Sequence, residues 1–333
     1  MSYSSWTPPE LLKVSSDFWL SSALHAGVKL DIFTPLSESP HAAPDLAHKL
    51  ELSERGLTML LDALVSLRLL EKDESNYRAS SFSAEFLSSN SSKYLGHIIR
   101  HHHHLMGSWF QLDEAVRSGE PVRNRISHEG EEIERESFLM GMFNLAMLTA
   151  PTIVNQIDLS GHSHLLDLGG GPGTYAIQFC WKNPALRATI VDLPSTQKLA
   201  EKNITNFDLH DRVNFVAGDF HDGTLSGSYD VAWLSHVLHA EGEQGCANML
   251  KKTVNALEPG GLLLIQDFIL DDNRSQPLFP ALFSLNMLVG TPQGKSYSEG
   301  EIKDMLNAAG CEQVERLPID LPNGAGIIKG YKA

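Results

Sequence analysis

The stretch that decides the fold reads His164-Leu165-Leu166-Asp167-Leu168-Gly169-Gly170-Gly171-Pro172-Gly173-Thr174. Its first part is a short apolar run, typical of a strand buried on both faces of a sheet, and residues 175–181 continue with an apolar pattern compatible with a helix. Gly169, Gly171 and Gly173 let the backbone between them take positive φ and approach a ligand closely. We therefore predict a strand, a tight turn and a helix that bind a nucleotide at the carboxyl edge of a parallel sheet.

The charge and spacing of this turn favour one nucleotide over another. The dinucleotide fingerprint G-x-G-x-x-G requires a glycine where this chain has Thr174. Asp167, just before the glycines, would repel a diphosphate bound at the helix N-terminus, but it would attract a cation. S-adenosylmethionine carries an ammonium and a sulfonium group and no phosphate. We therefore expect this cofactor rather than NAD.

Two further acids follow later strands of the same pattern. Asp192 ends a short apolar strand at residues 187–191, about twenty residues beyond the glycines, where ribose hydroxyls are bound. Asp219 and Phe220 follow a third strand at residues 213–216 and offer a carboxylate and an aromatic face to an adenine. Each acid alone could cap a helix. Their occurrence in consecutive strand–helix units predicts a cofactor site.

Four segments carry a resemblance to a known family: LLDLGGGPG (165–173), VDLP (191–194), GDF (218–220) and LEPGG (257–261). They resemble the successive motifs of class I S-adenosylmethionine-dependent methyltransferases. From about Leu11 to its end, the chain is similar to the O-methyltransferases that include plant caffeate and flavonoid enzymes, acetylserotonin O-methyltransferase and bacterial tailoring enzymes of polyketides and pigments. The resemblance implies an α/β fold: a Rossmann-like doubly wound sheet preceded by a mostly α winged-helix dimerisation domain, and hence a homodimer.

The resemblance also implies a cofactor site. Ser235 stands where plant relatives have a lysine that contacts the cofactor. The residues expected to bind S-adenosylmethionine are Asp167, Gly169, Gly171, Gly173, Asp192, Leu193, Asp219, Phe220 and Ser235.

The expected catalytic group follows the strand at residues 230–234. Residues 235–243 match the family pattern around the catalytic base, and His239 falls on that base. Asp267 matches the first of two acids that orient the base in plant relatives, whereas the second position falls on Ser296. Ala240 and Glu241 stand where many relatives have Asp and Trp. By resemblance, His239 is the general base for methylation of a hydroxyl on an aromatic or polycyclic small molecule.

Several alternatives to this chemistry remain open at the level of sequence. The same fold and cofactor serve N- and C-methylation and other reactions of S-adenosylmethionine. His239 can also be a packed histidine, or form a metal pair with His236 and Asp267. We expect no metal, because metal-dependent relatives use a carboxylate-rich site and lack the N-terminal module.

The acceptor pocket is expected to contain methionines. Residues 138–142 resemble a Phe-x-x-x-Met segment by which the family's connecting helices reach over the active site, so Met142 and Met147 would line the pocket. Met287 and Thr291 match a pocket methionine and a neighbouring polar position. Methionines at helical spacing can equally fill a core. A pocket with few fixed charges fits a flat, largely apolar aromatic acceptor.

Composition sets the broader limits. A chain of 333 residues suffices for two domains, and we place a winged-helix dimerisation domain at 1–100, a helical connector at 101–160 and the cofactor-binding domain at 161–333. The net charge of −15 disfavours nucleic acid and anionic membranes as partners. No apolar run is expected to reach the ~20 residues of a membrane span. Three widely spaced cysteines fit the reducing cytoplasm.

The N-terminal region allows a second class of protein. A short helix near residues 44–47, a longer one at 53–70 and a hairpin at 71–79 predict a winged helix, which is also the fold of DNA-binding regulators. Residues 45–78 contain five Lys or Arg against seven Asp or Glu, so this segment lacks the excess of positive charge that DNA binding needs. A regulator that senses the cofactor is therefore the weaker alternative.

The run His101-His102-His103-His104 is expected to lie on a helix without binding metal, because adjacent histidines point in different directions around a helix.

Overall fold

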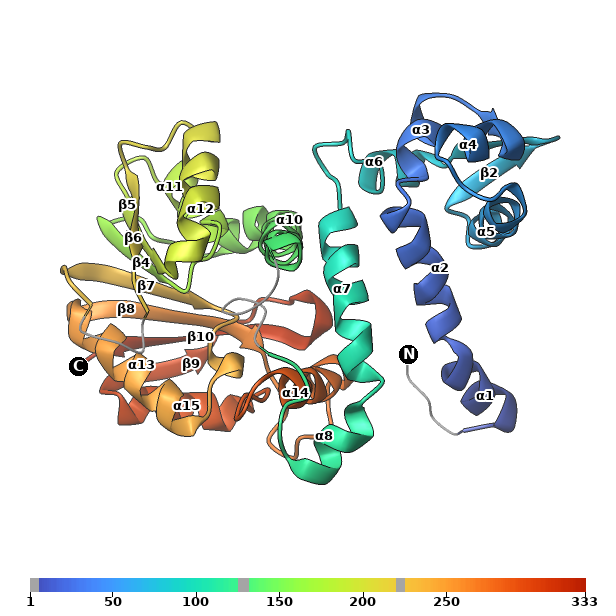
Figure 1. Ribbon diagram of the computed structural model, residues 1–333. Helices are drawn as coiled ribbons and strands as arrows, with labels where there is room; N and C mark the ends of the chain where they lie inside the picture. Colours follow the sequence, from blue (N-terminus) through green and yellow to red (C-terminus); the bar gives the residue numbers. More distant parts are fainter. Residues whose placement is uncertain (1–5, 125–131, 220–224) are drawn as a thin grey trace. The chain divides into compact units, whose positions relative to one another are not determined.

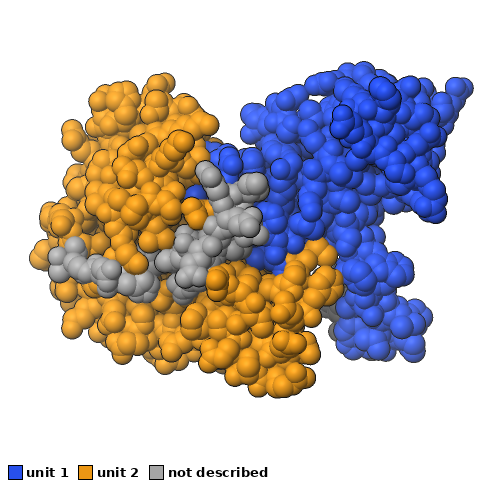
Figure 2. All heavy atoms as spheres, in the orientation of Figure 1, with its two compact units in different colours: residues 1–105, 136–144 blue, residues 106–135, 145–333 orange. Residues whose placement is uncertain are grey.

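The structure is a computed structural model that describes residues 6–124, 132–219 and 225–333 (Figure 1). The chain forms two compact units, shown in different colours in Figure 2. Unit 1 consists of residues 1–105 and 136–144, and unit 2 of residues 106–135 and 145–333. Each unit has its own hydrophobic core.

Unit 1 begins with a pair of helices and continues with the predicted helix–helix–hairpin arrangement. Its helices are α1 (Pro8–Ser16), α2 (Phe18–Lys29), α3 (Phe33–Glu38), α4 (Ala43–Lys49), α5 (Glu54–Ser66) and α6 (Ser81–Phe86), followed by α7 (Gly96–Trp109), which continues into unit 2. A three-stranded sheet has the order β1-β3-β2, from β1 (His41–Ala42), β3 (Asn76–Ala79) and β2 (Leu70–Asp73). The hairpin β2–β3 packs with α5 over a core that includes Phe33, Leu46, Leu61 and Leu64.

The first two helices leave large apolar side chains in solvent. Leu12 and Trp19 are 69% and 67% exposed, and Leu11, Phe18 and Leu20 are also exposed. α1 has no buried residue at all. This group of apolar side chains lacks a covering surface within its own unit.

Unit 2 contains a seven-stranded sheet with the order β6-β5-β4-β7-β8-β10-β9. Its strands are β4 (His164–Leu168), β5 (Arg187–Asp192), β6 (Val213–Ala217), β7 (Tyr229–Ser235), β8 (Leu257–Phe268), β9 (Cys311–Arg316) and β10 (Ala325–Lys332). β4 to β8 are parallel to one another, whereas β10 is antiparallel to both β8 and β9. The strand β9 had not been predicted.

Helices cover both faces of this sheet, as Figure 1 shows. The helices of unit 2 are α8 (Leu112–Ser118), α10 (Glu132–Gln156), α11 (Thr174–Lys182), α12 (Pro194–Asn206), α13 (Glu243–Ala256), α14 (Leu278–Gly290) and α15 (Glu299–Ala308), with α10 shared with unit 1. One core joins the sheet to α10, α11 and α12, and a second core on the opposite face joins it to α13 and α15. This arrangement confirms the doubly wound fold predicted from the sequence.

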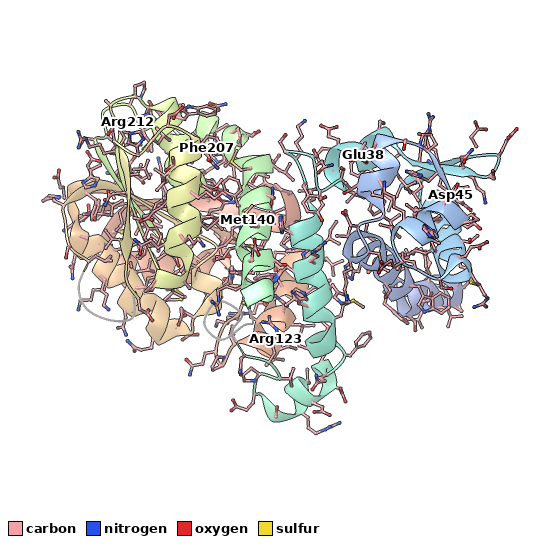
Figure 3. All side chains as sticks on the ribbon, turned by 45° about the horizontal axis from the view of Figure 1, so that its top comes forward. Glu38, Asp45, Arg123, Met140, Phe207 and Arg212 are labelled. Atoms are coloured by element: carbon pink, nitrogen blue, oxygen red, sulfur yellow. The ribbon has the colours of Figure 1, made fainter. Side chains whose placement is uncertain are left out.

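A single arginine anchors the turn after α11. Nη1 of Arg212, labelled in Figure 3, lies 2.8 Å from the carbonyl oxygen of Cys180 and 3.1 Å from that of Asn183. The carbonyl groups at the end of a helix have no partners within the helix. Arg212 therefore fixes the end of the helix that begins at the glycine turn.

The order of the strands reverses at β4. From β4 the chain adds β5 and β6 on one side and β7 and β8 on the other. Ligands of doubly wound folds bind outside the carboxyl ends of the strands at such a reversal. The predicted cofactor and catalytic residues lie at or just beyond the carboxyl ends of these five strands.

The helix α10 corrects one expectation. Among the described residues, its segment Arg135–Gln156 is long and apolar enough to cross a membrane, by length and composition only. No such segment had been expected from the sequence. A core helix of a globular protein passes the same test, and Ala150, Ile153 and Val154 of α10 are buried against the sheet of unit 2.

Candidate functional site

The glycine turn after β4 is closely packed at Gly169 and Gly173 and open at Gly171. Gly169, Gly171 and Gly173 have φ values of 68°, 54° and 84°. A Cβ atom on Gly169 would lie 2.6 Å from Val237 Cγ2, and one on Gly173 would lie 2.7 Å from Ile190 Cδ1. A Cβ atom on Gly171 would meet nothing within 4 Å. The turn thus offers its open side at Gly171.

Gly170 also has a role that sequence reasoning missed. A Cβ atom there would lie 2.6 Å from Cγ of Asp167, so only glycine lets the turn close over this carboxyl group. The signal was present in the sequence as the unbroken run of three glycines.

The carboxyl group of Asp167 lies beneath the turn rather than beside it. Asp167 is 1% exposed, its Oδ2 accepts a hydrogen bond from Ala176 N at 3.1 Å, and its Oδ1 is buried without a hydrogen-bond partner. Burial raises the pKa of Asp167 to about 7, and the nearby Asp192 carboxylate adds to the increase. A buried acid with an unused oxygen is stabilised in its charged form by a cation.

Asp192 connects β5 to the turn. Its Oδ2 accepts a hydrogen bond from Gly171 N at 2.7 Å, and its Oδ1 accepts one from Leu193 N at 2.6 Å. A backbone N–H that would suit a phosphate oxygen is therefore already bound by a carboxylate. Together with Asp167, this makes the turn a poor site for a diphosphate and a good one for a positively charged ligand.

The other predicted cofactor residues lie along the same edge. Asp219 follows Gly218, whose N–H donates to the carbonyl oxygen of Asp192 at 2.9 Å, so β5 and β6 end together. Ser235 ends β7, and its Oγ lies 3.4 Å from Gln266 Oε1 on β8. The predicted Phe220 lies outside the described residues.

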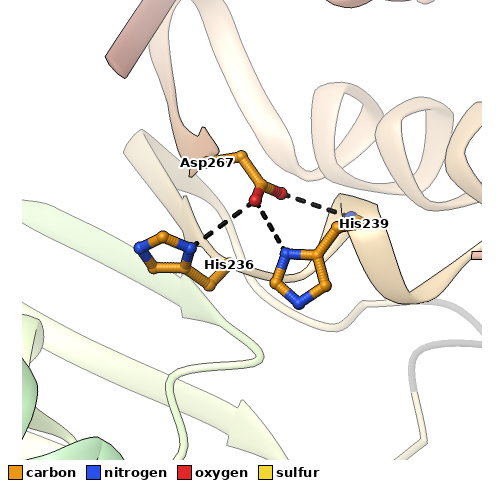
Figure 4. A group of neighbouring side chains, drawn as sticks. All are labelled: His236, His239 and Asp267. Atoms are coloured by element: carbon orange, nitrogen blue, oxygen red, sulfur yellow. Dashed lines mark hydrogen bonds and ion pairs between the residues drawn. The ribbon is translucent and has the colours of Figure 1, made fainter. Parts of the chain in front are cut away.

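The expected base and its acid are in direct contact (Figure 4). Nδ1 of His239 donates to Asp267 Oδ1 at 2.7 Å, and His239 N donates to Asp267 Oδ2 at 3.2 Å. His239 lies in the 3₁₀ turn η1 (Leu238–Ala240) that follows β7, and Asp267 lies near the end of β8. Burial opposes ionisation of Asp267, but His239 and His236 outweigh it and hold the pKa of this carboxyl group well below its usual range.

A second histidine faces the same carboxylate. Nδ1 of His236 lies 3.5 Å from Asp267 Oδ1, which is too long for a good hydrogen bond. The ring packs against Phe268 with centroids 4.5 Å apart. His236 has φ of +56°, and such strain in a residue other than glycine is concentrated at functional sites.

Aromatic side chains surround His239, and sequence reasoning missed them. Phe283 meets the imidazole edge-to-face at 4.8 Å, and Phe268 lies 4.7 Å from Phe283 and 4.9 Å from Phe279. Phe279 is 39% exposed, so this cluster reaches the surface. The available signal was the spacing of Phe279 and Phe283, four residues apart on one face of α14.

The predicted acceptor residues lie on α10 and at the end of α14. Met287 is buried on α14, and the hydroxyl of Thr291 donates to Met287 O at 2.8 Å and accepts from Gly294 N at 2.9 Å, so it holds the turn after the helix. Met147 lies in unit 2, where its sulfur is 3.6 Å from Gln178 Nε2 of α11. Met142 lies on the part of α10 that belongs to unit 1. The pocket roles of these residues remain predictions.

Two of the positions at which the sequence departs from its relatives are buried in the structure. Glu241 is 8% exposed, and its carbonyl oxygen accepts a hydrogen bond from Tyr297 at 2.6 Å, so it belongs to the packing between α13 and the chain before α15. Ser296 is fully buried, and its Oγ has no hydrogen-bond partner. The only carboxylate that the described residues bring to the His239 side chain is therefore Asp267.

Comparison with known proteins agrees with this geometry. An O-methyltransferase domain matches residues 109–312, and an O-methyltransferase dimerisation domain matches residues 12–89. The chain belongs to the O-methyltransferase family. It is 33% identical to a 3-hydroxy-5-methyl-1-naphthoate 3-O-methyltransferase of Streptomyces sahachiroi, over 98% of this chain and 96% of the relative. It is 31% identical to a tetracenomycin polyketide synthesis 8-O-methyl transferase of Streptomyces glaucescens, over 96% of each chain.

Solved structures of the family connect the site to its cofactor. Human N-acetylserotonin methyltransferase in complex with S-adenosylmethionine superimposes with a TM-score of 0.85, at 26% identity and over all of both chains. This O-methyltransferase accordingly uses S-adenosylmethionine as its methyl donor. The unpaired oxygen of Asp167 and the open side of Gly171 are the features of this chain that fit such a ligand.

Proposed function

We propose that this enzyme transfers a methyl group to a hydroxyl on an aromatic or polycyclic small molecule, with His239 as general base. The observation that carries the proposal is the hydrogen bond between His239 Nδ1 and the buried Asp267 carboxylate. An ionised carboxylate can only accept hydrogen bonds, so Nδ1 of His239 keeps its proton. The lone pair of Nε2 is then free to take a proton from the acceptor.

The energetic demand on the base is modest. A phenol with a pKa of about 10 costs about 4 kcal/mol to ionise at pH 7. Bound S-adenosylmethionine supplies an activated methyl group on a sulfonium ion. Removal of the hydroxyl proton by His239 during transfer, with Asp267 stabilising the resulting imidazolium, lowers this cost. Holding the acceptor oxygen close to the methyl group supplies most of the remaining acceleration.

The aromatic cluster supports the proposed class of acceptor. Phe268, Phe279 and Phe283 present ring faces and edges next to the base, and flat aromatic molecules pack favourably on such surfaces. Of the bacterial relatives named above, one is named for the methylation of a hydroxynaphthoate and the other for tetracenomycin polyketide synthesis, which fits the same class.

We also propose that the enzyme is a homodimer formed through its N-terminal domain. The dimerisation domain covers residues 12–89 and includes most of the exposed apolar side chains of α1 and α2. A second copy of this chain would remove these side chains from water.

The cysteines fit an enzyme of the reducing cytoplasm, because Cys180, Cys246 and Cys311 are all buried and free.

The proposal is tested by incubating the enzyme and S-adenosylmethionine with a set of hydroxylated naphthalenes and polycyclic phenols, and analysing the products by mass spectrometry. We expect a mass increase of one methyl group for at least one member and none for its O-methylated counterpart. Methylation of matched aromatic amines but of no phenol would contradict the proposal.

A further inference from the structure

We propose that a divalent transition-metal ion, with zinc as the reference case, binds reversibly to His236, His239 and Asp267 and inhibits methyl transfer. One ligand atom from each of these side chains lies within 4.8 Å of the other two. Two imidazoles and one carboxylate are ligands that suit zinc, copper and nickel. Three protein ligands leave a fourth position of a tetrahedral zinc ion to water.

The three side chains are held in place but not yet at metal-binding distance. Phe268 N donates to Asp267 Oδ1 at 2.8 Å and His239 N donates to Oδ2 at 3.2 Å, so backbone groups orient the carboxylate as they orient metal ligands. Zinc bonds of about 2.0–2.1 Å place neighbouring ligand atoms about 3.3 Å apart. His236 Nδ1 and His239 Nδ1 lie 3.5 Å and 2.7 Å from Asp267 Oδ1, so the largest separation is the one between the two imidazoles, and the His236 ring must move toward His239. Its Nδ1 is buried and has no hydrogen-bond partner that would oppose this movement.

Solvent can deliver the ion through His236. The side chain of His236 is 31% exposed, whereas those of His239 and Asp267 are 12% and 3% exposed. The His236 ring thus lies between solvent and the two deeper ligands, and because its Nδ1 is itself buried, the ring must move to admit the ion.

Metal binding would change the tautomer of the base. The ion replaces the proton on His239 Nδ1, and that proton is taken up on Nε2 through solvent, so the ring stays neutral. Nε2 then has no lone pair to accept the proton of the acceptor hydroxyl. The inhibitory half of this inference rests on the proposed role of His239, whereas metal binding itself does not.

The test is a titration with Co²⁺, a coloured substitute for zinc, of enzyme saturated with S-adenosylhomocysteine. We expect visible d–d absorption that saturates at one equivalent, is lost in His236→Asn and His239→Asn, and is kept in His162→Asn. His162 is the matched control because its Nδ1 lies 3.7 Å from Asp230 Oδ1, at the amino ends of the strands and away from the site. His104→Asn should also keep the signal, which separates this site from the histidine run of α7. His236→Phe, which retains an aromatic ring against Phe268, serves as a second variant if His236→Asn misfolds.

Turnover and cofactor binding complete the experiment. Zinc at one equivalent should lower wild-type turnover at least tenfold, EDTA should restore it, and the affinity for S-adenosylhomocysteine measured by calorimetry should not change. Equal Co²⁺ spectra for wild type and His236→Asn would overturn the site, and activity that requires added zinc would overturn the inhibitory role. If His239→Asn retains full turnover while its Co²⁺ signal is lost, the proposed base fails but the metal site stands.

Discussion

Nδ1 of His239 and Oδ1 of Asp267 are 2.7 Å apart, although 28 residues separate them in the sequence. The contact forms because β7 and β8 are parallel neighbours, so the turn after β7 lies beside the end of β8. Asp267 also accepts the backbone N–H groups of His239 and Phe268. The acid therefore fixes both the position of the turn and the tautomer of the imidazole.

Replacing the imidazole of His239 should lower the rate of methyl transfer without changing the affinity for the cofactor. We expect His239→Ala to lower the rate of methyl transfer at least tenfold, because the acceptor proton loses its recipient. The affinity for S-adenosylhomocysteine, measured by calorimetry, should stay near that of wild type. His162→Ala is the matched control, since His162 also faces an aspartate but lies at the amino ends of the strands, away from the site. Unchanged turnover in His239→Ala would show that the enzyme works without this base.

The sequence predicted the strands better than the contacts between them. Apolar runs located β4 to β7, but β9 has the burial pattern of an edge strand, with Cys311 alone buried, and its polar residues gave no strand signal. The bond from Gly171 to Asp192 depends on which strand adjoins β4 and in which register. The spacing of Phe279 and Phe283 shows that they share a face of α14, but only the fold shows that this face meets His239.

The buried acid beneath the glycine turn should make stability depend on pH. Burial raises the pKa of Asp167 from 3.8 to about 7, and the other titratable groups near it are Asp192, Tyr175 and Cys180. Between these pH values the folded protein holds a proton that the unfolded chain has released. The contribution of Asp167 to the free energy of unfolding is therefore greatest below pH 3.8 and falls by up to about 1.4 kcal/mol per pH unit until about pH 7.

Urea unfolding at several pH values within this window measures the effect. Asp167→Asn should be less dependent on pH than wild type across the same range, because the amide does not titrate. Parallel curves for the two proteins would contradict the assignment of the slope to Asp167.

The carboxyl group of Asp167 should also couple cofactor binding to proton release. The positive charge of S-adenosylmethionine favours the ionised form of Asp167, so binding should release protons and tighten as the pH rises toward about 7. Calorimetry in two buffers of different ionisation enthalpy counts the protons released. Asp167→Asn should release fewer protons and bind more weakly. Equal proton release by both proteins would show that Asp167 is already ionised in the free enzyme.

Alanine substitutions at two glycines of the turn should have different effects, one mainly on the free energy of unfolding and the other mainly on cofactor affinity. Gly173 has φ of 84° and no room for a Cβ atom, so Gly173→Ala should lower the free energy of unfolding by about 2 kcal/mol. Gly171 has φ of 54° and open space beside it, so Gly171→Ala should cost only about 1 kcal/mol in folding. Its new methyl group enters the open side of the turn, where we propose that the cofactor binds, and should weaken S-adenosylhomocysteine binding at least tenfold. Denaturation and calorimetry on both variants give the comparison, and a cofactor affinity for Gly171→Ala equal to that of wild type would place the cofactor elsewhere.

The exposed face of α1 and α2 should determine the oligomeric state. Trp19 is 67% exposed, and burying such a side chain at an interface contributes on the order of 2–3 kcal/mol. We expect Trp19→Ser combined with Leu12→Ser to shift sedimentation from dimer to monomer at micromolar concentration. Trp181→Ser is the matched control, because Trp181 is 61% exposed on α11 in unit 2, outside the dimerisation domain. A Trp181→Ser variant that dissociates while the double variant stays dimeric would place the interface on unit 2 instead.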